Sequence, residues 1–195
     1  MGVGSRRLLP VFVVLWVMAG CTPVSAPVVS PAPSFRCTPE AGGDEFDCSQ
    51  HQYDEMVAKD ALYAEAEAVY RKFLAEDTRI MRAGGVTEPT EVLLETTSGE
   101  FLEDVMGIYR TARAKGLSAR GSDPALVTFR RQPDRKKGES LVAATTCVDN
   151  GHLEYFENGK SLGRGTPTLD ENYFSRVDGG LKLIGADGKQ VESCN

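Results

Sequence analysis

The sequence predicts an α+β domain in which helices pack on a curved antiparallel sheet, preceded by a signal peptide and a flexible tether. Three observations predict this class. Residues 50–115 have a helical spacing of apolar side chains, residues 125–194 have short extended segments separated by Gly and Asn turns, and residues 1–34 have the composition of an export signal and a spacer. Helices followed by a run of strands are typical of α+β domains.

Residues 1–20 have the three parts of an export signal. Arg6 and Arg7 supply positive charge, residues 8–18 are mostly apolar, and Ala19 and Gly20 are the small residues expected before a cleavage site. The apolar run is shorter than the roughly 20 residues that cross a bilayer as a helix. We therefore expect a cleaved signal peptide rather than a membrane-spanning helix.

Cys21 directly follows this segment. Residues 18–21, Met-Ala-Gly-Cys, resemble the lipobox of bacterial lipoproteins. The resemblance implies that Cys21 is lipidated and becomes the first residue, so that acyl chains anchor the chain to the extracytoplasmic face of the cell membrane. A secreted chain with an unlipidated Cys21 is the alternative. Residues 5–9 also resemble a twin-arginine signal, so general-secretory and twin-arginine export both stay open.

The stretch after Cys21 is expected to be a spacer. Residues 22–34 consist mainly of Pro, Val, Ser and Ala, a composition that favours extended, solvated backbone. We assign residues 21–49 to the lipidated cysteine, the tether and a small cysteine loop. Residues 50–195 then form the folded domain.

Charge excludes one class of partner. The chain has 22 basic and 28 acidic side chains and a formal charge of −6, which becomes −8 when Arg6 and Arg7 leave with the signal. Nucleic-acid binders have the opposite balance, so we expect no nucleic-acid partner. Anionic headgroups would repel such a domain, so membrane attachment is expected through the acyl chains.

Four cysteines remain besides Cys21: Cys37, Cys48, Cys147 and Cys194. An even number in an oxidising compartment predicts two disulfides, for which three pairings exist. The first two cysteines lie close together before the first helix and the last two lie in the strand-rich half, so we predict Cys37–Cys48 and Cys147–Cys194. Their spacings are not those of a zinc site, and no metal is expected.

The first helix is expected to begin at Ser49, whose side chain with that of Gln52 completes a capping box, and to end at Gly84-Gly85. Its apolar stripe is typical of core rather than of a ligand surface. The stripe consists of Leu62, Ala66, Val69 and Phe73, flanked by Tyr63, Tyr70, Leu74, Ile80 and Met81.

A short helical piece is expected over residues 89–94. Ser98 is expected to cap a further helix over residues 99–115, which Gly116 ends.

Beyond Gly116 the pattern becomes extended. Asp149-Asn150-Gly151 is a strong hairpin signal, and Asp178-Gly179-Gly180 is expected to join two paired strands. The expected strands cover residues 125–132, 140–148, 152–156, 173–177, 181–184 and a last segment that ends at Cys194.

Several short motifs carry a family resemblance. They are Tyr70-Arg71-Lys72-Phe73, Cys147-Val148-Asp149, Glu157-Asn158-Gly159-Lys160 and Glu192-Ser193-Cys194. Together with the order of helices and strands, they resemble nuclear transport factor 2-like lipoproteins of actinobacteria over residues 50–195. The resemblance implies a cone fold with a concave apolar pocket and a sheet face that commonly supports homodimers. It implies no established activity.

Candidate catalytic groups have little motif context. Enzymes with the cone fold use Asp, Tyr or His inside the cone, where burial tunes the pKa. His51 is expected to be solvated, His152 begins a strand, and Asp149 is expected to bond its own turn. Tyr109, Tyr155 and Tyr173 are expected to pack in the core or at an edge. We therefore predict no catalytic residue and no cofactor.

One basic cluster stands out: Arg130, Arg131, Arg135, Lys136 and Lys137. Its plainer interpretation is a solvated turn that protects a sheet edge from pairing. The alternative is a contact site for an anionic envelope polymer or lipid headgroups.

The preferred interpretation is a membrane-tethered, non-enzymatic domain that binds a small apolar ligand or an envelope protein. The alternative is a cone-fold isomerase or hydrolase acting on a small apolar substrate. A deep apolar pocket that contains Asp or His would favour the enzyme, and a pocket filled by side chains would favour an interaction module.

Overall fold

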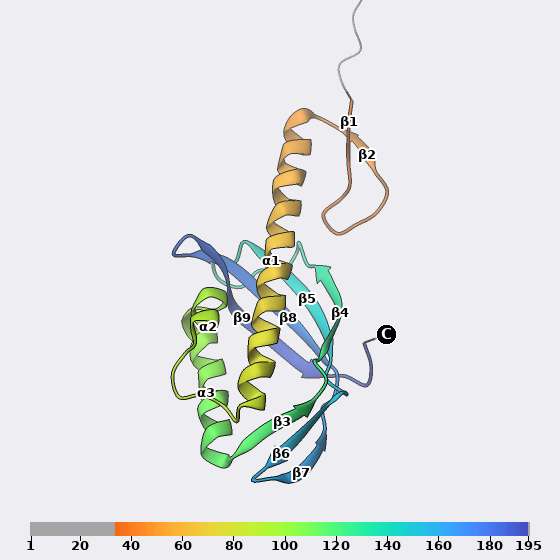
Figure 1. Cartoon of the computed structure of the whole chain (residues 1–195). Helices are drawn as coiled ribbons and strands as arrows, with labels where there is room; N and C mark the ends of the chain where they lie inside the picture. The colour runs from red at the N-terminus through yellow and green to blue at the C-terminus, as the bar shows by residue number, and fades with distance from the viewer. Residues whose placement is uncertain (1–33, 195) are drawn as a thin grey trace, which may run out of the picture. The chain divides into compact units, whose positions relative to one another are not determined.

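A computed structural model describes residues 34–194, which lie in one compact unit. The expected signal peptide, the expected lipidation at Cys21 and the tether up to residue 33 lie outside the described residues. The described part is α+β, with helices and antiparallel sheets, as the sequence predicts (Figure 1).

The described chain begins with a small hairpin, continues with three helices and ends with a run of strands. The hairpin is formed by β1 (Phe35–Cys37) and β2 (Phe46–Cys48), and the helices are α1 (Gln50–Arg82), α2 (Glu91–Thr96) and α3 (Gly99–Lys115). The remaining strands are β3 (Leu117–Gly121), β4 (Ala125–Arg131), β5 (Val142–Asp149), β6 (Leu153–Glu157), β7 (Lys160–Arg164), β8 (Thr168–Val177) and β9 (Gly180–Gln190).

The strands after α3 form two antiparallel sheets. The larger has the order β4-β5-β8-β9 and the smaller has the order β3-β6-β7. Helices α1, α2 and α3 contact β9 of the larger sheet, and α1 and α3 also contact β3 of the smaller one. The sheets are not closed into a barrel.

The expected hairpin across Asp149–Gly151 is wrong, because β5 and β6 do not pair with each other. β5 pairs with β4 and β8, whereas β6 pairs with β3 and β7. The turn itself is formed, since the Asp149 carboxylate accepts the Gly151 N–H at 2.8 Å. Local turn chemistry fixes where the chain reverses but not which strand it joins, and here the turn connects the two sheets.

The start of α1 follows its sequence signal. Ser49 is the N-cap, and both hydrogen bonds of the capping box with Gln52 are formed. The buried side of α1 is shifted by about one residue from the predicted stripe. Tyr63, Ala66 and Tyr70 are buried. Leu62, Val69 and Phe73, which were predicted to be central, are partly exposed.

The ends of the other helices differ slightly from the expectation. α2 lies two residues later than predicted, with Thr90 as its N-cap. Ser98 occupies the N-cap position of α3, but its side chain makes no capping hydrogen bond, so this predicted role is wrong. Gly116 ends α3 in the left-handed conformation at φ 66°, as the sequence predicts.

The predicted strands need four corrections. β3 and β7 were not predicted, β8 begins at Thr168 rather than at Tyr173, and β9 continues to Gln190, so no separate last strand reaches Cys194. β7 is exposed at every residue and lacks the apolar alternation that identifies half-buried strands.

Both predicted disulfides are present. Cys37–Cys48 joins β1 to β2 with a Cα–Cα distance of 5.9 Å. Cys147–Cys194 joins the middle of the larger sheet to the chain after β9 with a Cα–Cα distance of 5.6 Å. Both separations lie within the usual range of protein disulfides.

Candidate functional site

The space between the helices and the sheets contains a carboxylate that the sequence analysis did not single out. Asp77 lies on α1, and the Tyr109 hydroxyl of α3 donates a 2.8 Å hydrogen bond to its Oδ1. Burial raises the pKa of Asp77, and the hydrogen bond from Tyr109 opposes this rise. Burial also raises the pKa of Tyr109. Asp77 follows Phe73 by four residues and precedes Ile80 by three, so its place on the apolar stripe was the available signal.

A second carboxylate, Asp170 of β8, has similar electrostatics. Burial raises its pKa, and a hydrogen bond from the Thr168 hydroxyl opposes the rise. The charges of Asp170 and Asp77 both raise the pKa of Tyr70, after the larger effect of its own burial. Tyr70 therefore lies within the electrostatic reach of both carboxylates.

Side chains fill the middle of this interior. Tyr70, Phe129 and Phe174 form a chain of tilted aromatic contacts, with ring centroids 6.5 Å and 6.4 Å apart. Next to them Asn172 Nδ2 donates to the Thr146 hydroxyl at 2.9 Å, and both residues are buried. These polar groups have partners within the protein, as a packed core requires.

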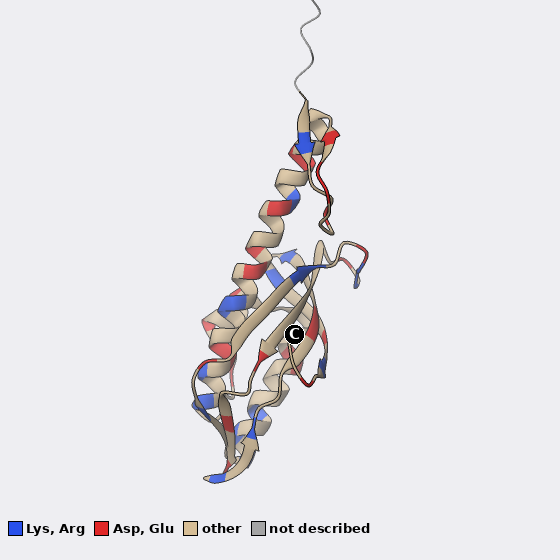
Figure 2. Ribbon diagram, turned by 90° about the vertical axis from the view of Figure 1, so that its right-hand side faces the viewer, with Lys and Arg blue, Asp and Glu red and all other residues tan. Residues whose placement is uncertain are grey.

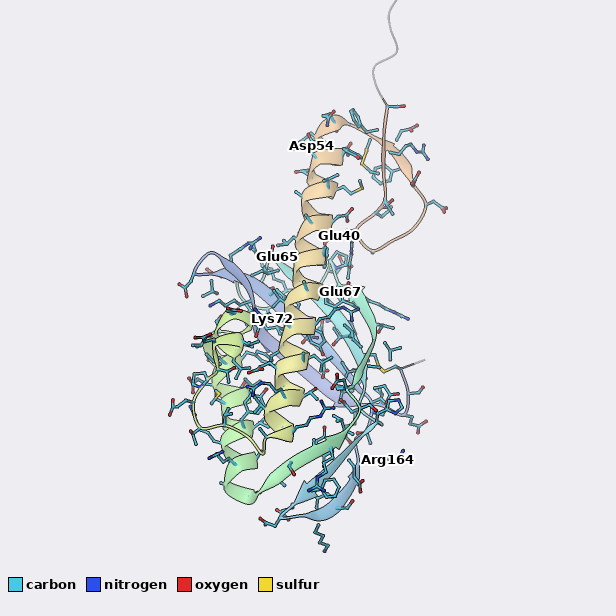
Figure 3. All side chains as sticks on the ribbon, viewed as in Figure 1. Glu40, Asp54, Glu65, Glu67, Lys72 and Arg164 are labelled. Carbon is cyan, nitrogen blue, oxygen red and sulfur yellow. A yellow bond between two sulfur atoms is a disulfide. The ribbon has the colours of Figure 1, made fainter. Side chains whose placement is uncertain are left out.

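The small hairpin docks on α1 close to the start of the helix. The Tyr63 hydroxyl donates to Glu40 Oε1 at 2.7 Å, and the Thr38 N–H lies 3.1 Å from the sulfur of Met56. Phe35 and Tyr53 pack with ring centroids 5.3 Å apart. Figure 3 shows Glu40 beside α1.

Two surface hollows lie next to the loop between β1 and β2. The first, of about 520 Å³, lies between the loop and α1, and apolar Met56, Ala58 and Leu62 contribute to its lining beside charged Glu55 and Lys59. The second, of about 670 Å³, lies between residues 38–42 and the end of β4.

The basic cluster divides into paired and unpaired side chains. Its paired members contact carboxylates on three other elements. Arg131 forms an ion pair with Asp60 of α1, Arg135 Nε lies 3.2 Å from Glu171 Oε1 of β8, and Lys137 Nζ lies 3.2 Å from Asp187 of β9. Within residues 34–194, Arg130 and Lys136 have no such ion pair. Most of the cluster therefore joins elements together.

The other predicted candidates are not brought together. His51 is exposed on the first turn of α1, 3.4 Å from Glu55, and His152 is exposed at the turn before β6. Tyr173 is buried against Lys137, whose Nζ lies 5.5 Å from its ring centroid. Burial raises the pKa of Tyr155, with a smaller contribution from the charge of Asp77.

No group of three or more His, Cys, Asp or Glu side chains within residues 34–194 is placed to hold a metal ion. None of the helices in this part of the chain is long and apolar enough to cross a membrane. Comparison with protein-family models finds no match, and comparison with curated proteins finds no similar sequence.

Proposed function

We propose that this chain is a lipid-anchored lipoprotein of the extracytoplasmic face, whose nuclear transport factor 2-like domain is a non-enzymatic interaction module of the cell envelope. The observation that carries the proposal is the hollow of about 520 Å³ between α1 and the loop residues Thr38 and Glu40. It is open, partly apolar and ringed by charge, which suits a segment of a protein partner.

The contrast with the interior favours binding over catalysis. Asp77 is the best-placed general base, but Tyr109 already donates to it, and aromatic side chains occupy the neighbouring space. The open volume lies at the surface instead. Exposed Val57, which lies between the lining residues Met56 and Ala58 in the sequence of α1, adds to the apolar area that a partner would cover.

The lipid anchor is tested through Cys21. Labelled palmitate should be incorporated into the wild-type chain in cells, and the Cys21→Ala variant should lose the label and leave the membrane fraction. Labelling of the variant at the wild-type level contradicts the proposed anchor.

The interaction surface is tested by crosslinking in the native membrane. A photoreactive amino acid at position 56 should give a discrete crosslinked product with a partner protein. Position 127 on β4 is the control, because Val127 is an exposed apolar residue that does not line the hollow. Identical products at both positions, or none at position 56, contradict the proposal.

The alternative of a cone-fold isomerase or hydrolase rests on the raised pKa of Asp77. If that alternative holds, turnover of small apolar ketones or esters by the purified domain should be abolished by Asp77→Asn. The interaction module predicts no turnover by either protein.

A further inference from the structure

Three of the surface hollows join into one trough across the larger sheet. The hollow between residues 38–42 and β4 shares Arg130 and Gln132 with a hollow of about 310 Å³. That hollow in turn shares Thr145 and Leu169 with a third, of about 510 Å³. The trough therefore runs from the edge strand β4 towards β9.

The register of the sheet gives this trough a regular floor. Cross-strand partners point to the same face, and Val142, Ala144 and Val148 of β5 point into the core, so Thr145 and Cys147 point away from the helices. Two neighbouring rows of side chains follow across the four strands. One row is Arg130, Thr145, Glu171 and Asp187, and the other is Thr128, Cys147, Leu169 and Lys189.

The unpaired charges in the trough are positive. Each carboxylate that lines it has a cation partner: Glu40 lies 4.0 Å from Lys59, Asp60 is paired with Arg131, Glu171 with Arg135, and Asp187 with Lys137. Arg130 and Lys189 are exposed and form no ion pair within residues 34–194, and they stand in neighbouring rows at opposite ends. Figure 2 shows acidic and basic residues interspersed over the ribbon, and the chain as a whole is acidic. The two cations without an ion pair are therefore a local feature of this sheet.

The uncharged groups of the trough are mostly short hydrogen-bonding side chains. Thr128, Gln132 and Thr145 offer hydroxyl and amide groups, while Leu169 and the Cys147–Cys194 disulfide supply a small apolar floor. Glu171 Oε1 is buried, and its neighbour is the Arg135 Nε at 3.2 Å, so it is closed to a bound molecule.

We propose that this trough binds an acidic polysaccharide. Arg130 pairs with one carboxylate of the chain, in the bidentate geometry that guanidinium favours, and Lys189 pairs with another. Sugar hydroxyls bond the threonine and glutamine side chains between them. The near end of the trough shares Thr38, Glu40 and Asp60 with the partner surface at Met56, but the two cations Arg130 and Lys189 do not line that surface, so the variants below test the trough alone.

The direction of the trough distinguishes this occupant from two others. A peptide that extends a sheet lies along an edge strand, whereas the trough crosses four strands and spans about 15 Å at the usual strand spacing. A single lipid headgroup would fill one hollow and leave the other cation unpaired. A linear chain with repeated carboxylates satisfies both ends.

The test measures the affinity of the purified domain for short polygalacturonate by calorimetry. We expect binding that weakens with added salt, and an affinity at least about tenfold lower in the Arg130→Glu/Lys189→Glu double variant. Lys136→Glu is the matched control, since Lys136 is an unpaired cation of the same hairpin that lies outside the hollows, and it should change the affinity less than about twofold.

Further arms keep the proposal falsifiable. The neutral double variant Arg130→Gln/Lys189→Gln should lose most of the affinity while its thermal unfolding stays that of the wild type. Neutral dextran, polyglutamate and anionic phospholipid vesicles should bind at least about tenfold more weakly than polygalacturonate. The proposal is overturned by absence of polygalacturonate binding, by equal binding of polyglutamate or vesicles, or by an equal loss in Lys136→Glu.

Discussion

Asp77 is an ionisable residue in a largely buried environment. It is a carboxylate on the apolar side of α1, held by one hydrogen bond from Tyr109, which belongs to the buried cluster with Ile80, Leu93 and Met106. Partial burial without a cation nearby disfavours its charged form, which is why its pKa rises. Asp77 could act as a general base only if a substrate took the place of the Tyr109 hydroxyl.

This gives a prediction for the dependence of stability on pH. A carboxyl with a raised pKa in the folded chain keeps its proton to higher pH than in the unfolded chain, so the folded state binds more protons and stability falls as pH rises. The fall begins near the ordinary carboxyl pKa of about 4. Asp77→Asn removes this contribution and should flatten the decline in the free energy of unfolding above that pH.

Urea denaturation of both proteins between pH 4 and 7 measures the difference. Tyr109→Phe is the informative control, because it removes the hydrogen bond to Asp77 and should destabilise the domain by about 1–3 kcal/mol. Since that bond opposes the rise of the Asp77 pKa, its loss should also extend the decline in stability to higher pH. Equal slopes in the wild type and Asp77→Asn would contradict the account given for Asp77.

At the scale of elements, helix ends and turns follow the sequence closely and strand partners do not. The capping box at Ser49 and the left-handed Gly116 are local, since each depends on a few neighbouring residues. Local signals also predicted the turn at Asn150 correctly, but the hairpin predicted across it is wrong. Strand pairing depends on packing against residues far along the chain, which local signals do not report. The exposed β7 gave no apolar pattern at all.

The candidate sites show the same division. Arg130 and its neighbours were visible as a charge cluster, but Glu171, Asp187 and Asp60 lie too far along the chain for their pairing to be predicted. The register of the larger sheet is needed to see which carboxylates lie near Arg130. Lys189 joins this group only through the β8–β9 ladder.

The junction of α1 and α3 gives a prediction at this scale. A Cβ on Gly85, at φ 82°, would lie 2.2 Å from the Tyr109 carbonyl oxygen and 2.8 Å from the Arg113 nitrogen. Gly84 has nearly the same φ, 81°, but its nearest contact would be an ordinary 3.5 Å. We expect Gly84→Ala to cost about 1–2 kcal/mol for the left-handed backbone alone, and Gly85→Ala to cost clearly more.

Thermal or urea unfolding of the two alanine variants measures this difference directly. Because the two glycines are adjacent and share one backbone conformation, the difference between them isolates the close approach of α3. Equal destabilisation would mean that the helices separate freely at this point.

At the scale of the whole molecule, the two disulfides constrain different parts of the domain. Cys147–Cys194 closes a segment with a sequence separation of 47 that includes β6 to β9, and it ties the chain after β9 to the sheet. Cys37–Cys48 closes a segment with a separation of 11 at the edge of the domain, whose contacts are mostly to α1. The first constrains the core sheet and the second constrains the loop beside the proposed partner surface.

Replacing each pair by serine should therefore give different results. Loss of Cys147–Cys194 should lower the free energy of unfolding of the whole domain by about 4 kcal/mol in the chain-entropy model. Loss of Cys37–Cys48 should mainly release residues 35–48 and leave the sheets folded, because the hairpin makes no contribution to the two core sheets.

Hydrogen exchange distinguishes the two outcomes. In the Cys37→Ser/Cys48→Ser variant, amide protection should fall in residues 35–48 and stay unchanged in β5 and β8, and crosslinking from position 56 should weaken as the hollow loses one wall. In Cys147→Ser/Cys194→Ser, protection should fall throughout the larger sheet. Uniform loss in both variants would mean that the hairpin is an integral part of the core, and the partner surface would then be no more separable than the sheet itself.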